Sequence, residues 1–258
     1  MTKAISYTLV FLGIQLLTST LAMTVLEATG HAEWVKSPYT TIAAMTFSSL
    51  LTLAVFLRFK WAEASRDYLL SRPLLAILWS ALAGIGVVLP SMYIQELMPE
   101  LPNLIEEDMM GIISTPGGYF VICLLAPLVE ELVMRGAVLR SLLQWKPEKR
   151  WGMIALSALF FAVIHMNPAQ MPHAFAMGLL LGWMYVRTDS IVPGVAFHWA
   201  NNTVAYLLMR IYPDPDTKMI DLFGDNRHVI MAVAFSLCIL LPALFQLYQQ
   251  LKKATHRA

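Results

Sequence analysis

Charged residues are scarce in this sequence. Of its 258 residues, 14% are Asp, Glu, Lys or Arg, whereas 58% are hydrophobic. The mean hydropathy of +0.62 is far above that of an ordinary soluble domain. The 18 basic and 17 acidic residues leave a formal net charge of +1, so there is no basic excess to neutralise the phosphates of a nucleic acid. We therefore expect no nucleic-acid partner and predict a protein of the lipid bilayer.

Cysteine is almost absent. Cys123 and Cys238 both lie in apolar stretches, so we interpret them as small buried hydrophobic residues and not as a disulfide or metal framework. The first apolar run also lacks a small-residue cleavage site, and it is long enough to span a membrane, which predicts an uncleaved first helix. Repeats and low-complexity segments are likewise missing.

Long apolar runs fill most of the remaining sequence. A spanning helix needs roughly 20 mostly apolar residues, and this length predicts an all-α, polytopic membrane helix bundle with about eight transmembrane helices. The expected spans are 5–26, 39–58, 74–94, 117–143, 152–166, 169–187, 191–211 and 228–250. We divide them into an N-terminal region (1–115) with about three helices and an acidic outer loop, a catalytic region (116–211), and a last region (212–258) with an outer loop, the last helix and a basic tail.

The basic residues indicate an orientation for these spans. Cytoplasmic loops carry the excess of Lys and Arg in membrane proteins. With eight spans, thirteen of the 18 basic residues, from Lys3 to Arg257, fall on the side of both termini. The four on the opposite side are Lys36, Arg210, Lys218 and Arg227, and the remaining one, Arg135, lies within a span. We therefore expect a multi-pass protein, most simply of the cell membrane, with both termini in the cytoplasm.

Three ionisable residues interrupt an apolar stretch in "APLVEELVMRG" (126–136). Charged side chains inside a membrane usually face a protein interior or a water-filled cavity. Glu131 and Arg135 are four residues apart, so they lie on one helical face and can neutralise each other. Glu130 points about 100° away from Glu131 and needs a partner from another helix.

Two other spans supply polar residues at helical spacing. "FFAVIHMNP" places Phe161 and His165 on one face, before an expected helix end at Asn167-Pro168. "GVAFHWANNT" places His198 and Asn202 on one face. Polar clusters on three apolar helices predict one shared interior site.

These motifs, taken together, resemble the CPBP family of intramembrane proteases, which includes the type II CAAX prenyl endopeptidases and the bacterial Abi proteins. The segments "EELVMRG", "SALFFAVIHM" and "GVAFHWANN" follow the order and spacing of that family. The resemblance runs from about residue 116 to 209, and residues 1–110 share only their hydrophobic character with the family.

The resemblance implies a catalytic site made of Glu130, His165, His198 and Asn202. Glu130 would act as the general base on a water held jointly with His165. His198 and Asn202 would donate hydrogen bonds to the oxyanion of the tetrahedral intermediate. Glu131 and Arg135 would form a structural ion pair. His173 belongs to none of the motifs, so we interpret it as a lining or packing residue.

Other functions stay open on these residues alone. One Glu and two His residues are also the ligands of a zinc-dependent protease, although the helical His-Glu-x-x-His signature is missing; we expect no cofactor but do not exclude zinc. A non-enzymatic carrier or an immunity or scaffold protein would keep the same fold, although the inverted repeats typical of carriers are not found. The expected partner is a membrane-associated protein or peptide substrate. Its identity, its prenylation and the oligomeric state are not determined by the sequence.

Overall fold

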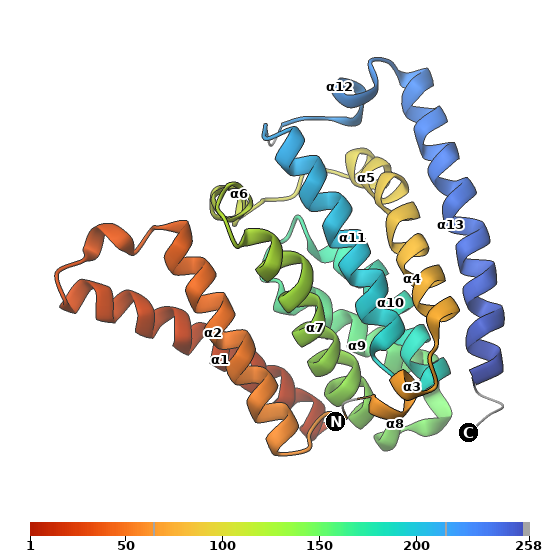
Figure 1. The fold of residues 1–258 in the computed structure, drawn as a ribbon, viewed down its shortest axis with the longest axis horizontal. Helices are drawn as coiled ribbons and strands as arrows, with labels where there is room; N and C mark the ends of the chain where they lie inside the picture. Colours follow the sequence, from red (N-terminus) through yellow and green to blue (C-terminus); the bar gives the residue numbers. More distant parts are fainter. Residues whose placement is uncertain (64, 215, 255–258) are drawn as a thin grey trace.

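The computed structural model describes residues 1–63, 65–214 and 216–254 (Figure 1). Within these ranges every regular element is helical, which confirms the prediction of an all-α membrane bundle. The part of the basic tail that contains Arg257 lies outside the described residues.

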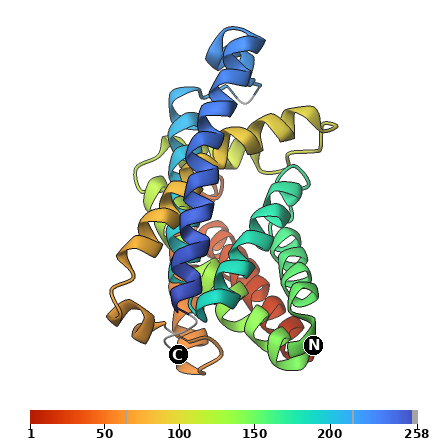
Figure 2. The ribbon, with the colours of Figure 1, turned by 90° about the vertical axis from the view of Figure 1, so that its right-hand side faces the viewer.

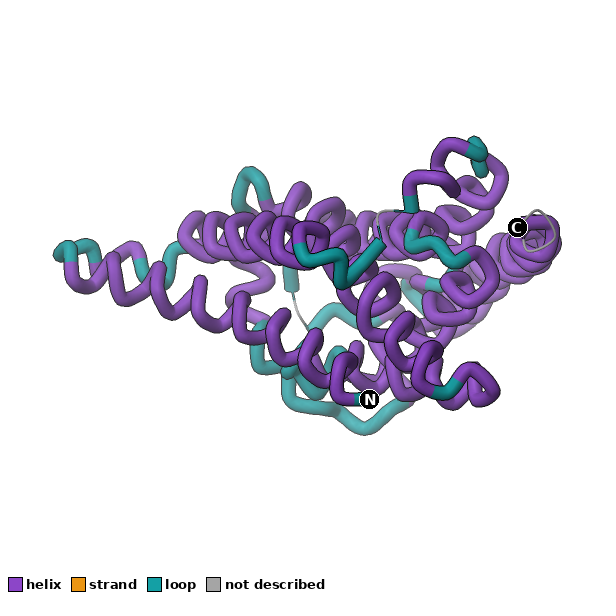
Figure 3. Tube along the Cα trace, turned by 90° about the horizontal axis from the view of Figure 1, so that it is seen from below, coloured by secondary structure: helices purple, strands orange, loops and turns teal. Residues whose placement is uncertain are grey.

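The first two helices form a hairpin that leans away from the other helices (Figures 1 and 3). Its elements are α1 (Thr2–Ala28), the short 3₁₀ turn η1 (Ala32–Trp34) and α2 (Pro38–Arg58). Hydroxyl groups inside the hairpin bond to the carbonyl one turn earlier, as Thr8 does to Ala4 at 3.0 Å and Thr52 to Ser48 at 2.8 Å. This bond satisfies a polar group within its own helix, so it can lie in an apolar environment.

A second group of helices packs closely because of glycine. After the short α3 (Arg66–Leu70) follow α4 (Leu74–Gly86) and α5 (Val88–Leu97). A Cβ atom on Gly84 would lie 2.3 Å from the Phe197 carbonyl oxygen, and one on Gly86 would lie 2.7 Å from the Leu240 backbone nitrogen. Helix α4 therefore fits between α11 (Val192–Ile211) and α13 (Asn226–Ala254) only because both residues lack a side chain.

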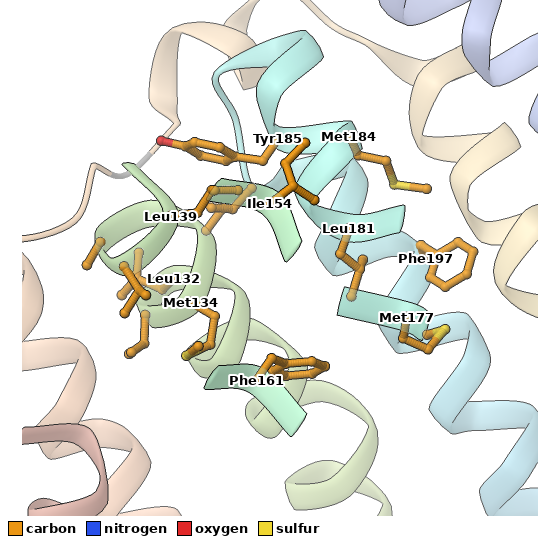
Figure 4. Packing of buried hydrophobic residues seen from close by; sticks show 14 of the residues in the cluster. Leu132, Met134, Leu139, Ile154, Phe161, Met177, Leu181, Met184, Tyr185 and Phe197 are labelled. Atoms are coloured by element: carbon orange, nitrogen blue, oxygen red, sulfur yellow. The ribbon is translucent and has the colours of Figure 1, made fainter. Parts of the chain in front are cut away.

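The centre of the bundle is a helical stretch that changes register twice. After α6 (Glu106–Ser114), it consists of the π-helical segment η2 (Phe120–Leu125), α7 (Ala126–Glu131), the π-helical segment η3 (Leu132–Leu139) and α8 (Arg140–Trp145). All residues of η3 are buried. Figure 4 shows Leu132, Met134 and Leu139 of this segment packed with side chains of the neighbouring helices.

The remaining helices complete the bundle, and the last of them runs along its length (Figure 2). They are the 3₁₀ turn η4 (Pro147–Lys149), α9 (Arg150–Ile164), α10 (Met171–Thr188), α11 (Val192–Ile211), α12 (Met219–Phe223) and α13 (Asn226–Ala254). Gly178 and Gly182 of α10 are four residues apart and face α9, where a Cβ on Gly178 would lie 2.8 Å from Ala158. Small residues at this spacing allow two helices to approach each other in a membrane.

Among the described residues, four helices are long and apolar enough to cross a membrane: Thr2–Ala28, Pro38–Arg58, Leu74–Leu97 and Asn226–Leu251. They correspond to the first, second, third and eighth expected spans. The other four expected spans are also helical, but α9 has only 15 residues and the central stretch is divided by its π-helical segments. The chain thus has the hydrophobic helices of an integral membrane protein, while the count of eight spans and the three-region division remain predictions.

The start of α1 and the end of α13 lie at one end of the bundle, and α6 and α12 lie at the other (Figure 1). Of the two cysteines, Cys123 is buried as expected, but Cys238 is exposed, so its predicted burial was wrong. Cys238 lies on the outward side of α13, where an apolar side chain needs no protein neighbour if lipid surrounds the helix.

Candidate active site

The adjacent residues Glu130 and Glu131 have different surroundings. The side chain of Glu131 is 0% exposed, whereas that of Glu130 is 20% exposed and lines a cavity. Neighbouring positions on a helix point about 100° apart, so one carboxylate enters the core and the other enters the cavity. The two glutamates are therefore not interchangeable.

Glu131 is neutralised by a residue of the same helical stretch, four positions later, as the sequence predicts. Arg135 Nη1 lies 2.9 Å from Glu131 Oε1, and both side chains are buried. The guanidinium also donates to the Gly178 carbonyl at 3.4 Å and lies over the ring of Phe161 at 4.3 Å. The pair is thus held by α10 and α9 as well as by the central stretch.

His198 connects the two glutamates. Its Nδ1 lies 3.3 Å from Glu131 Oε1, and its Nε2 lies 3.9 Å from Glu130 Oε2. An ionised carboxylate only accepts hydrogen bonds, so Nδ1 carries a proton and donates a hydrogen bond to Glu131. Glu131 therefore orients the ring so that Nε2 faces Glu130, the partner from another helix that Glu130 requires.

His165 follows the last residue of α9 and is oriented by the backbone. Its Nδ1 lies 2.7 Å from the Phe161 carbonyl oxygen, which can only accept, so Nδ1 is the protonated nitrogen. In the neutral ring Nε2 is then an acceptor. The ring of Phe161 meets the rings of His165 and His198 edge to face, with centroids 4.9 and 5.9 Å away, so Phe161 fixes both imidazoles.

Asn202 is bound to the central stretch at a point where a backbone donor is missing. In a π-helix the carbonyl of residue 122 pairs with the N–H five residues later, but residue 127 is proline and has no N–H. The Ile122 carbonyl instead accepts a hydrogen bond from Asn202 Nδ2 at 3.1 Å. Asn202 Oδ1 accepts from Asn201 Nδ2 at 3.3 Å. One N–H of the Asn202 amide is left for another acceptor.

All four residues that the resemblance implies as catalytic line one cavity of about 500 Å³. Glu130, His165, His198 and Asn202 come from three different helices, so the structure brings together what the motifs predict. Its lining also includes residues of α6 (Glu106, Met109, Met110) and Asp214, Thr217 and Leu222. Helices α6 and α12 lie at the end of the bundle opposite the start of α1 (Figure 1), so the lining extends toward that end.

Several polar residues of this region were not identified from the sequence. Asn167 is buried and accepts a hydrogen bond from the Leu104 backbone at 2.9 Å, while its amide donates to Asn103 at 2.9 Å. This contact ties the outer loop to the turn after His165. Asn201 also lines the cavity, and the signal for it was the second asparagine in "WANN". His173 was interpreted as a lining or packing residue, and it does line the cavity.

No three His, Cys, Asp or Glu side chains among the described residues are grouped so that they could hold a metal ion.

Comparison with known families supports the resemblance. Residues 113–204 match the model of the family described as "Type II CAAX prenyl endopeptidase Rce1-like". This segment is similar to that family. The Rce1-like segment covers about a third of the chain and contains all six residues of the predicted site, which confirms the resemblance to the CPBP family. Neither a curated protein nor a solved structure matches the chain. The Rce1-like match supports a CAAX-type intramembrane protease in general.

Proposed function

We propose that the protein is an intramembrane endopeptidase in which Glu130 and His165 activate a water molecule. One observation carries this proposal: of two adjacent glutamates, one is fully buried in an ion pair and the other lines a cavity together with two histidines. A carboxylate with only a structural role would not need to line a cavity. A carboxylate that reacts with water and substrate has to be accessible from one.

In the proposed reaction the water oxygen attacks the carbonyl carbon of the scissile bond, and Glu130 accepts the proton. The Nε2 atom of His165 is an acceptor, so it can hold the second hydrogen of the same water. The Nε2 of His198 and the remaining N–H of Asn202 donate to the oxyanion. Glu130 then returns the proton to the amine nitrogen as the C–N bond breaks. No cofactor is required for these steps.

His198 has to be an imidazolium to perform this role. Its Nδ1 already donates to Glu131, so Nε2 can donate to an oxyanion only when both ring nitrogens carry protons. The Glu131–Arg135 pair thereby supports catalysis indirectly, because it fixes the ring that stabilises the oxyanion.

The substrate is a protein or peptide that reaches the cavity from the membrane. We propose that both termini are cytoplasmic, which the distribution of basic residues supports. The cavity then opens on the opposite, outer side, where α6 begins with Glu106, Glu107 and Asp108. On this basis the cleaved bond lies in a segment exposed at the outer side of the membrane.

The direct test is cleavage by protein purified in detergent. A library of internally quenched peptides, each made with and without a prenylated cysteine, is incubated with the wild-type chain and with Glu130→Gln. We expect wild-type cleavage that Glu130→Gln abolishes, in a protein that elutes as a monodisperse peak. Wild-type turnover by Glu130→Gln on the same peptide would refute the assignment.

A further inference from the structure

A third histidine lines the same cavity and is outside the three motifs. His173 lies in the first turn of α10. Its Nδ1 is 2.6 Å from the hydroxyl oxygen of Ser91 on α5. The two residues are 82 positions apart in the sequence, so only the fold brings them together.

The hydroxyl of Ser91 is bound differently from several other hydroxyls in the apolar helices. Thr8, Thr52 and Ser80 donate to the carbonyl one turn earlier. The Ser91 hydroxyl instead meets His173, and it also receives a hydrogen bond from Gln95 Nε2 at 3.3 Å. The contact allows either atom to donate, and we assign the Ser91 hydroxyl as the donor to His173 Nδ1. With this assignment Nδ1 is the acceptor, and the neutral ring carries its proton on Nε2.

This proton faces the cavity. Within the described residues no group accepts a hydrogen bond from His173 Nε2, and this atom is not among the buried polar atoms without a partner. His165 has the opposite arrangement, because its Nδ1 donates to Phe161 and leaves Nε2 as an acceptor. The cavity thus contains one histidine that accepts and another that donates.

A nucleophilic role for Ser91 fits the geometry less well. The described residues that line the cavity include its neighbours Met92 and Gln95 and also His173, but not Ser91. A serine nucleophile has to reach the substrate. The hydrogen-bonded series runs from Gln95 through Ser91 to His173. Gln95 and His173 both line the cavity, but only His173 has a ring N–H that is not used within the series.

We propose that His173 is a substrate-binding residue whose Nε2–H donates to a backbone carbonyl of an extended peptide next to the scissile bond. The proposal rests on the protease function proposed above. A neutral carbonyl fits better than a terminal carboxylate, because Glu106 and Asp214 also line the cavity and would repel a negative charge. Met92, Met109 and Met110 line the same space, and methionine adapts to apolar side chains of different shapes. The substrate class is therefore an internal, apolar peptide segment.

The kinetic test compares two substitutions at one position. His173→Gln keeps an N–H donor at about the same reach, whereas His173→Leu removes it. One hydrogen bond contributes about 0.5–1.5 kcal/mol, so His173→Leu should raise KM about 3- to 10-fold on the cleaved library peptide, with kcat within about twofold. His173→Gln should restore most of the affinity. The matched control is His228→Gln, which changes an exposed histidine of α13.

The tautomer is tested without turnover. Nitrogen-15 NMR of histidine-labelled protein in detergent, with His173 assigned from the signal lost in His173→Gln, should show the proton on Nε2, and Ser91→Ala should weaken this preference. A proton on Nδ1, an unchanged KM in His173→Leu, or a fall in kcat alone would overturn the proposal. Failure of the protease function itself is recognised separately, by full turnover in Glu130→Gln.

Discussion

The difference between the adjacent glutamates leads to opposite outcomes for one chemical change. Glu131→Gln leaves Arg135 buried without a negative charge, in a place where Glu131 Oε2 and Arg135 Nε already have no hydrogen-bond partner. Breaking a buried ion pair in this way costs about 3–5 kcal/mol. At about 2–4 °C per kcal/mol for chains of similar size, the melting temperature should fall by roughly 10 °C.

Glu130→Gln should leave the melting temperature nearly unchanged. Its partner His198 is 3.9 Å away and its side chain is partly exposed, so the loss of this contact costs less than about 1 kcal/mol. Turnover should nevertheless fall at least about 10²-fold, the usual contribution of a general base.

Both variants are measured by size-exclusion thermostability in detergent and by cleavage of the same peptide. The matched control is Glu148→Gln, which changes an exposed glutamate of η4. The double variant Glu131→Gln/Arg135→Met should recover much of the lost stability, because no charge stays unpaired. Equal melting temperatures for Glu131→Gln and wild type, or an equal loss in Glu130→Gln, would refute the reasoning.

The remaining predictions concern the oxyanion, the metal, the topology and one glycine. Asn202→Ala should lower kcat about 10²- to 10³-fold with little change in KM; a change in KM alone would argue against oxyanion binding. Purified protein should stay active in chelator, and stoichiometric zinc that is lost and restored together with activity would favour the metalloprotease. In a cysteine-free background, an impermeant thiol reagent should label a cysteine at Asn103 from outside and one at Glu148 only after permeabilisation; labelling of both from one side would contradict the orientation. Gly194→Ala should reduce stability and turnover together, because a Cβ atom there would lie 2.7 Å from Glu131 Oε2, and full activity would show that Glu131 tolerates displacement.

The sequence predicted the parts of the site that depend on helical spacing. The Glu131–Arg135 contact follows from a separation of four residues. The need of Glu130 for a partner on another helix followed from its different direction, and His198 is that partner. The presence of His165 in the same cavity followed from the motifs, because polar residues in apolar membrane helices usually face the interior of the bundle, where three such helices can meet.

The sequence did not predict the hydrogen bonds that orient these residues. The acceptors of His165 and Asn202 are the backbone carbonyls of Phe161 and Ile122. Every residue has a backbone carbonyl, so the residue type does not indicate which one accepts. The contact between Ser91 and His173 joins residues 82 positions apart, and no periodicity connects them. The register changes at η2 and η3 were also missed, since apolar patterning does not separate π-helical from α-helical turns.

The number of spans illustrates a related limit. Hydropathy identifies long helices that bury little of their surface in the protein, and α1, α2, α4 with α5, and α13 have at most a third of their apolar window buried. The helices that form the site are missed for other reasons: α9 has only 15 residues, the central stretch is divided by its π-helical segments, and α10 and α11 carry polar residues. The number of membrane spans is therefore hardest to predict for the helices that form the candidate site.

The position of Glu131 connects fold and chemistry in this protein. Its carboxylate reaches the core because Gly194 of α11 has no side chain and Gly178 of α10 offers its carbonyl to Arg135. The same carboxylate accepts from His198, so the packing of α10 and α11 determines where the His198 ring points. A substitution that moves either helix by a fraction of an ångström would then change the position of the oxyanion donor without removing a catalytic group. The proposed chemistry thus depends on close helix packing at glycine as much as on the ionisable residues of the motifs.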